Sequence, residues 1–312
     1  MVRCMERYVS LAKTVVVLPI ATSIAARPSY DPGALVFQTV AGWLAVLLCV
    51  AVVCAADEAG PAVTPEGEPI VLCDGTLDAF YTWMKDTQYE DPRDVFRITD
   101  GMIHVTGDGL GGLVTKKSYR DYHCVLEFKW GKRTWNNRVN RAKDSGLLVH
   151  STGPDGAYEG TWKHSLEVQI IQGGCGDFIQ VTSGNKELPM SLTCEVTTDR
   201  DGETVWHKGG EKKTFHSARI NWYGRDPDWK DTLGFRGKQD IESPGEKWTQ
   251  FDVYCKGAQI SVYVNGVLVN EGFDAQPSMG QLQLQSEQAE IFVRKWELWP
   301  VEGGPKPAAA VQ

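Results

Sequence analysis

Two runs of β-forming residues flank a two-residue turn in the stretch Ala258-Gln259-Ile260-Ser261-Val262-Tyr263-Val264-Asn265-Gly266-Val267-Leu268-Val269. Asn and Gly readily take the positive φ angles of the primed turns that join antiparallel strands. The stretch therefore predicts a β-hairpin, and the remaining sequence is interpreted outward from it.

Other segments also alternate between apolar and polar residues. In residues 124–130 the cysteine, leucine, phenylalanine and tryptophan fall on one face, and residues 165–170 and 281–285 alternate as cleanly. No amphipathic helix of ordinary length is predicted after residue 70. Many short strands, with no helices to cover a parallel sheet, predict an all-β fold of two antiparallel sheets packed face to face.

The first 56 residues differ in kind from the rest, because they hold two apolar stretches, 14–26 and 35–56. The second ends in Cys54-Ala55-Ala56, and signal peptidase requires small residues at its cut. The same stretch is long enough to be an uncleaved membrane anchor, and lipid attachment at Cys54 is a weaker alternative. We expect an exported protein, periplasmic or extracellular, and leave membrane attachment through this segment open.

The remaining chain is interpreted as one domain. Residues 57–69 are rich in Pro, Gly and acid and are expected to form a linker, residues 70–300 the domain, and residues 301–312 a disordered tail. The formal net charge is −8, and no basic patch is visible that could neutralise a run of phosphates. Nucleic acid is therefore not an expected partner.

Five cysteines remain outside the leader, at positions 73, 124, 175, 194 and 255. Their spacing matches no paired zinc-binding pattern. An odd number cannot pair completely within one chain. Cys175 and Cys194 are the candidates for a disulfide, and buried free thiols are expected for most of the others.

The polar residues of two alternating segments are the main candidates for a binding site. Glu167 and Gln169 point away from the core side of their strand, and Gln283 and Gln285 do so on another. Carboxylate and amide groups match the donors and acceptors of sugar hydroxyls, and Trp162 is a candidate to stack on a sugar ring. The alternative is that this face is polar only because it is exposed to solvent.

Further candidates flank these strands. His150 is expected to point away from the core and to shuttle protons, because the pKa of histidine lies near neutrality. Asp177 follows the Glu167 strand and either caps a turn or binds substrate. Arg294 either binds a substrate oxygen or pairs with a buried acid. Asp144 and Lys163 complete the predicted substrate-binding set.

Several blocks, in order and spacing, resemble the 3-keto-disaccharide hydrolase domain family over roughly residues 70 to 300. The blocks are Leu72-Cys73-Asp74-Gly75-Thr76-Leu77-Asp78-Ala79-Phe80, Asp144-Ser145-Gly146-Leu147-Leu148-Val149-His150, Ser165-Leu166-Glu167-Val168-Gln169-Ile170, Gly245-Glu246-Lys247-Trp248, Asn265-Gly266, Gly280-Gln281-Leu282-Gln283-Leu284-Gln285 and Phe292-Val293-Arg294. The resemblance implies a concanavalin A-like jelly-roll sandwich that is exported and acts on 3-keto sugars. The family commonly has an acid shortly after Glu-x-Gln, where this chain has Gln172.

The resemblance implies hydrolysis of 3-keto-disaccharides or related oxidised glycosides. A C3 ketone acidifies the C2 proton, so a base can remove it and the glycosidic oxygen can leave before water adds back. Our hypothesis takes Glu167 as base, Gln169 or Arg294 as the group that holds substrate oxygens, and His150 as an aid to proton transfer. Whether a divalent metal replaces the enolate stabiliser stays open. The alternatives are a non-catalytic carbohydrate-binding module of the same fold and a surface structural protein.

Overall fold

The computed structural model describes residues 61–307. The described residues belong to one compact unit. The predicted leader, residues 1–56, lies outside the described residues. Within residues 61–307, no helix has both the length and the apolar character needed to cross a membrane.

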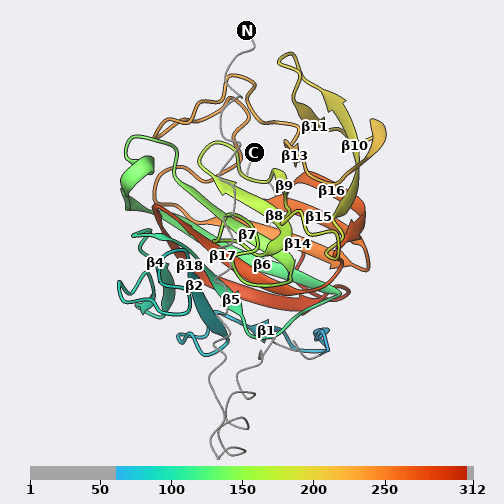
Figure 1. The fold of residues 1–312 in the computed structure, drawn as a ribbon. Coiled ribbons are helices and arrows are strands. Elements are labelled where there is room, and N and C mark those ends of the chain that lie inside the picture. The colour runs from blue at the N-terminus through green and yellow to red at the C-terminus, as the bar shows by residue number, and fades with distance from the viewer. Residues whose placement is uncertain (1–60, 308–312) are drawn as a thin grey trace, which may run out of the picture. The chain divides into compact units, whose positions relative to one another are not determined.

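The described part of the chain is almost entirely β-structure, in two antiparallel sheets (Figure 1). The seven-stranded sheet has the order β13 (Arg219–Ile220), β9 (Phe178–Val181), β8 (His164–Ile171), β7 (Asp144–Thr152), β17 (Gln281–Glu287), β5 (Leu110–Thr115) and β2 (Phe80–Met84). The eleven-stranded sheet contains β11 (Thr204–Trp206), β10 (Ser191–Thr198), β16 (Val267–Gln276), β15 (Gln259–Val264), β14 (Thr249–Lys256), β6 (Tyr122–Thr134), β18 (Ala289–Pro300), β4 (Met102–Val105) and β3 (Phe96–Thr99), with β1 (Ile70–Val71) beside β18 and β12 (Glu211–Phe215) beside β10. One 3₁₀ turn, η1 (Asn136–Arg138), interrupts this pattern. The predicted all-β sandwich is confirmed.

The predicted hairpin is present as β15 and β16. Asn265 and Gly266 have φ angles of 47° and 80°, as a primed two-residue turn requires. The strands that leave the turn pair from Val264 and Val267 onward. This turn therefore fixes the register of two neighbouring strands in the larger sheet.

The core lies between the two sheets. Leu126 and Phe128 of β6 are fully buried, and Val168 of β8 and Leu284 of β17 are buried on the facing side. Each such side chain contributes about 1.5–3 kcal/mol through removal of apolar area from water. Because these residues alternate with polar ones, the core uses one face of each sheet and leaves the other face for polar side chains.

All five cysteines of the domain are free, so the predicted disulfide between Cys175 and Cys194 is wrong. Cys175 lies just before β9 and donates its thiol to the Ile171 carbonyl at 3.4 Å. Cys194 lies in β10 of the other sheet. Both are buried in the core as small apolar side chains.

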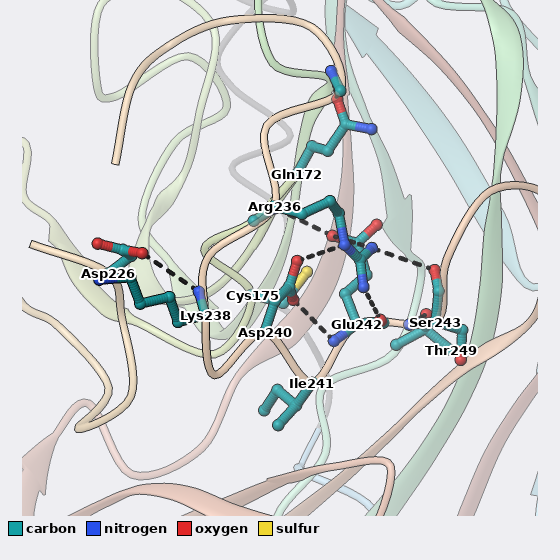
Figure 2. Close-up of polar contacts among 12 residues, drawn as sticks. Gln172, Cys175, Asp226, Arg236, Lys238, Asp240, Ile241, Glu242, Ser243 and Thr249 are labelled. Carbon is teal, nitrogen blue, oxygen red and sulfur yellow. Dashed lines mark hydrogen bonds and ion pairs between the residues drawn. The ribbon is translucent and has the colours of Figure 1, made fainter. Parts of the chain in front are cut away.

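The longest connection between strands in the described range is the loop of residues 221–248. Figure 2 shows Arg236 of this loop pointing toward Asp240, whose carboxylate lies 2.7 Å from it, and toward the carbonyls of Glu242 and Ser243. The Glu242 carboxylate accepts the Trp130 indole N–H at 2.5 Å and the Gly173 N–H at 3.0 Å. Burial raises the pKa of Glu242 to about 7. One buried carboxyl group therefore attaches the loop to β6 of the larger sheet and to the turn that follows β8 of the smaller one.

The ends of the described range also contact the domain. In the predicted linker, Val63 exchanges backbone hydrogen bonds with Ser118 and Arg120. In the predicted tail, Glu302 forms an ion pair with Lys256 at 2.5 Å, and the Pro305 carbonyl accepts the Tyr254 hydroxyl at 3.4 Å.

Candidate functional site

A row of paired residues crosses all seven strands of the smaller sheet. It runs through Arg219, Ile179, Glu167, Leu148, Gln283, Val114 and Tyr81, each the backbone partner of the next. Neighbours in such a row lie on the same face, about 4.8 Å apart in the hydrogen-bonding direction. Glu167 alternates with the core residues Leu166 and Val168, so this row lies on the face away from the core. The predicted direction of Glu167 and Gln169 is confirmed.

Glu167 has the electrostatics of a proton-exchanging group. It is 5% exposed, and its pKa is raised to about 8, mainly by burial and then by the negative charge of Glu287. Arg219 and a hydrogen bond with Gln285 oppose the shift, while Asp177 adds to it. The pKa of Glu287 is raised to about 7, mainly by burial, against the influence of Arg138. Two neighbouring carboxyl groups therefore hold or release protons close to neutral pH.

Two glycines leave the space that these side chains occupy. A Cβ at Gly146 would lie 2.4 Å from both Gln285 Oε1 and Glu167 Oε1. A Cβ at Gly112 would lie 1.8 Å from Gln283 Nε2. Both contacts are far closer than a Cβ tolerates, so the polar side chains lie flat over the backbones of Gly146 and Gly112.

Four polar atoms on this face are buried and have no hydrogen-bond partner within residues 61–307: Asp144 Oδ1, Gln169 Oε1, Gln283 Nε2 and Gln285 Oε1. An unsatisfied buried polar group costs about 1–3 kcal/mol. The other amide atom of Gln283, Oε1, accepts the Lys163 backbone N–H at 3.2 Å. Three of these atoms are acceptor oxygens and the fourth, Gln283 Nε2, is a donor. Together they could bind a ligand that carries hydroxyl and carbonyl groups.

The predicted residues Asp144 and Lys163 lie at this face in ion pairs. Asp144 pairs with Arg138, which also contacts Asp231 at 3.2 Å. The Lys163 ammonium lies 3.3 Å from the Asp155 carboxylate. One oxygen of Asp144 stays without a partner, whereas Lys163 serves the site through its backbone N–H.

The predicted stacking residue Trp162 lies over the same face. It is 7% exposed and packs with Leu148 and Val181 in a small apolar cluster separate from the main core. Leu148 lies between Glu167 and Gln283 in the transverse row. Trp162 therefore contributes an apolar wall next to the polar groups.

Asp177 is fully buried and holds two arginines. Its Oδ2 accepts Nε and Nη2 of Arg219 at 3.0 and 2.6 Å and also contacts Arg225, while Oδ1 accepts the Trp222 N–H at 2.9 Å. With both oxygens occupied, Asp177 does not bind substrate directly. It acts on the site by orienting Arg219, the neighbour of Glu167 beyond Ile179 in the row, and by its own charge, which adds to the raised pKa of Glu167.

The predicted orientation of His150 is wrong. His150 is completely buried, and its ring lies 5.9 Å from that of Tyr122, a core residue of the opposite sheet. The register of β7 shifts between Val149 and Thr152, and His150 has a φ of 55°, so the simple alternation fails at this residue. Burial lowers its pKa to about 4. His150 is therefore a neutral interior residue and not a part of the polar face.

Arg294 is also placed elsewhere. Its Nε lies 2.5 Å from Glu127 Oε2, and its guanidinium stacks 4.5 Å from the centre of the Trp248 ring. Glu127 alternates with the core residues of β6, so both partners lie on the outer face of the eleven-stranded sheet. The predicted alternative of pairing with an acid is the one observed, and Arg294 does not join the substrate-binding set.

The structure adds three residues that the sequence reasoning missed: Arg138, Arg219 and Glu287. Glu287 continues the spacing of Gln283 and Gln285, so the alternation itself could have identified it. Arg219 lies on a strand of only two residues, and its position depends on the pairing with Ile179. Arg138 comes from a turn with no such periodicity.

Gln172, which stands where the resemblance leads one to expect an acid, anchors the long loop. Its Oε1 accepts the Gly234 N–H at 2.8 Å, and its carbonyl accepts the Trp229 indole N–H at 3.1 Å. Within residues 61–307, no group of three or more His, Cys, Asp and Glu side chains could hold a metal ion. The residues of the polar face can exchange protons, donate and accept hydrogen bonds, and stabilise charge.

The model of the 3-keto-alpha-glucoside-1,2-lyase-like domain family matches residues 68–298. Among the curated proteins none matches the chain. Two similar solved structures are a Parabacteroides distasonis protein with a provisional glycosyl hydrolase assignment (16% identity, 74% of this chain and 98% of that chain, TM-score 0.41) and the carbohydrate-binding module CBM66 of Bacillus subtilis (12% identity, 64% and 88%, TM-score 0.37).

Proposed function

Because the chain belongs to the 3-keto-alpha-glucoside-1,2-lyase-like domain family, we propose that it cleaves glycosidic bonds of 3-keto-disaccharides or related oxidised glycosides. The observation that supports this proposal best is Glu167, a buried carboxyl group whose pKa of about 8 suits proton transfer near neutral pH. Elimination next to a ketone requires such a base, a stabiliser for the enolate oxygen and an acid for the leaving group.

The first step in the proposal is removal of the C2 proton by ionised Glu167. The electron pair of the C2–H bond moves toward C3, and negative charge develops on the C3 oxygen. Arg219 supplies positive charge beside Glu167, and Gln169 and Gln285 contribute amide groups whose oxygens have no partner in the described residues. Their N–H groups and the guanidinium are the donors that would stabilise the enolate oxygen.

The second step breaks the C1–O bond. The enolate electrons form the C1–C2 double bond, the C3 carbonyl is restored, and the electron pair of the broken bond leaves with the glycosidic oxygen. Glu287, with a pKa of about 7, supplies the proton to that oxygen. Water then adds at C1, Glu167 returns its proton to C2, and Glu287 takes the proton released by the water. The net reaction is hydrolysis.

The test is product release by the purified full chain from 3-keto-trehalose and 3-keto-cellobiose, with the unoxidised disaccharides as matched controls. Cleavage of the keto forms alone is the expected result, because only a C3 ketone acidifies C2. Loss of turnover in the presence of a chelator would indicate that the reaction requires a metal ion. Saturable binding of a keto sugar without cleavage would contradict the enzymatic function and favour the second candidate function, a carbohydrate-binding module.

The proposal includes export, on the basis of the apolar leader that ends in Cys54-Ala55-Ala56. The test of export is N-terminal sequencing of the mature protein, expressed in its native host and isolated from the cell envelope and the medium. A new N-terminus at Ala56 or Asp57 is expected for cleavage, and an intact Met1 would indicate an uncleaved anchor.

A further inference from the structure

A separate cavity of about 390 Å³ opens beside the site, at the edge formed by β13. This volume lies within the range of small-molecule sites, about 300–1,000 Å³. Its lining residues are Glu203, Thr204, Arg219, Asn221, Arg225 and Trp229. Arg219 is thus shared, since it also acts on the Glu167 carboxyl group.

The cavity is next to the reacting position proposed above. Only Ile179 lies between Arg219 and Glu167 in the transverse row. This separation is two strand spacings, about 10 Å between Cα atoms. A substrate whose C2 lies at Glu167 and which extends toward β13 would therefore reach the cavity with its next group.

The charges in the cavity are balanced. Arg219 and Arg225 share the buried carboxylate of Asp177, and Glu203 accepts the Asn221 amide at 2.6 Å. The lining thus combines two cations with one anion, and the buried Asp177 behind the two arginines balances the remaining positive charge. It offers hydroxyl, amide and carboxylate acceptors beside guanidinium donors. This mixture favours a neutral ligand with many hydroxyl groups over a phosphate or sulfate.

The far wall of the cavity is held in place. The Arg225 guanidinium stacks 4.6 Å from the centre of the Trp229 ring, and Trp229 donates its indole N–H to the Gln172 carbonyl. Both residues belong to the loop 221–248. Arg236 and Asp240 form an ion pair within this loop (Figure 2). Glu242 attaches the loop to Trp130 of β6 and to Gly173. A wall that is ordered before the ligand arrives costs little entropy on binding.

We infer that this cavity is the subsite for the leaving sugar, a neutral hexopyranose that stays bound through its hydroxyl groups while the 3-keto ring lies over Glu167. This inference rests on the proposed function, which it extends from the reacting ring to the rest of the substrate. It makes the enzyme selective for disaccharides over glycosides with a small alkyl group.

The experiment compares Trp229→Ala with Trp248→Ala on two substrates, 3-keto-trehalose and methyl 3-keto-α-glucoside. Trp248 is a matched control because it is stacked by Arg294 at 4.5 Å but lies on the outer face of the other sheet. Trp229→Ala is expected to lower kcat/KM about 10-fold for the disaccharide, mainly through KM, and to change it less than about 2-fold for the methyl glycoside. Trp248→Ala should change neither. Equal losses on both substrates would overturn the subsite.

Direct binding separates this inference from the proposed function. Calorimetric titration of the full chain with glucose is expected to show saturable binding that Trp229→Ala weakens and Trp248→Ala does not. If no keto sugar is cleaved but glucose binds in this manner, the proposed reaction is wrong and the inferred sugar subsite is supported. If keto sugars are cleaved but glucose does not bind, or if sulfate binds in its place, the subsite is wrong and the reaction stands.

Discussion

The two outer faces of this sandwich each carry a nearly buried glutamate, and the two glutamates differ in their partners. Glu127 on β6 is 8% exposed and is bonded to Arg294 at 2.5 Å, with Lys295 at 3.5 Å. Glu167 on β8 is 5% exposed, forms no ion pair among the described residues, and has Gln285 as its hydrogen-bond partner. The two glutamates are therefore buried to a similar extent, but within residues 61–307 only Glu127 is paired with cations.

The difference indicates which face is built for a ligand. Around Glu127 every acceptor finds a cation, and nearby Glu290 likewise accepts His104 and two backbone N–H groups. Around Glu167 the amide oxygens of Gln169 and Gln285 accept no hydrogen bond from any residue of 61–307. Folding alone does not favour unpaired acceptors, since each costs about 1–3 kcal/mol. A molecule bound at these atoms would offset that cost.

The strongest way to break this comparison is to neutralise both glutamates in turn. Glu167→Gln keeps the shape of the side chain but cannot accept a proton, so kcat on 3-keto-trehalose should fall about 10³-fold or more. Glu127→Gln should leave kcat within about 3-fold and should instead lower the melting temperature, because it leaves Arg294 without its anion. Comparable activity losses in the two variants would show that the faces are not functionally distinct.

The pH dependence of kcat/KM gives the next largest effect. The proposed reaction needs ionised Glu167, with a pKa of about 8, and protonated Glu287, with a pKa of about 7. The profile of kcat/KM should therefore be bell-shaped, with a rise of roughly 50-fold from pH 5 to its maximum near pH 7.5 and a fall at higher pH. Glu127→Gln should keep this profile unchanged. A profile that is already flat from pH 6 would mean that Glu167 is not the base.

The sequence predicted that Glu167 points away from the core, but it could not predict which of the two sheets contains Arg294. Alternation along one strand is a local property, so the directions of Glu167, Gln169, Gln283 and Gln285 followed from spacing alone. Which of two outer faces a polar row occupies depends on strand pairing between distant residues. Arg294 lies on β18, which pairs with β6 in the larger sheet.

His150 shows a second limit of alternation. The prediction placed it opposite Val149, but the register of β7 shifts after that residue and the His150 side chain turns into the core. A bulge adds one residue to one strand and inverts the faces beyond it. Arg219 was missed for the related reason that a two-residue strand carries no periodicity.

The glycines of the two faces sharpen the comparison. Gly146→Ala places a Cβ 2.4 Å from Glu167 Oε1, and Gly131→Ala places one 2.3 Å from Glu290 Cγ and Oε2 on the other face. Both substitutions force a carboxyl side chain to move. Gly146→Ala should lower kcat/KM about 10-fold with a small change in melting temperature, because it displaces a base whose position controls the rate. Gly131→Ala should lower the melting temperature and leave kcat/KM unchanged.

The smallest expected effect is on stability as a function of pH. Glu167 has a folded-state pKa of about 8 against an ordinary value of 4.5, so between these pH values the folded state keeps a proton that the unfolded state has lost. The free energy of unfolding must therefore fall as the pH rises through this window and level off above it. Glu287 and Glu242, with pKa values of about 7, add to the same slope. Urea unfolding at pH 5, 7 and 9 should show a shallower decline in Glu167→Gln than in the parent chain, while Glu127→Gln should keep the parent slope. An unchanged slope in Glu167→Gln would mean that Glu167 is ionised in the folded protein at neutral pH, and the contrast between the two faces would then not lie in the protonation of their glutamates.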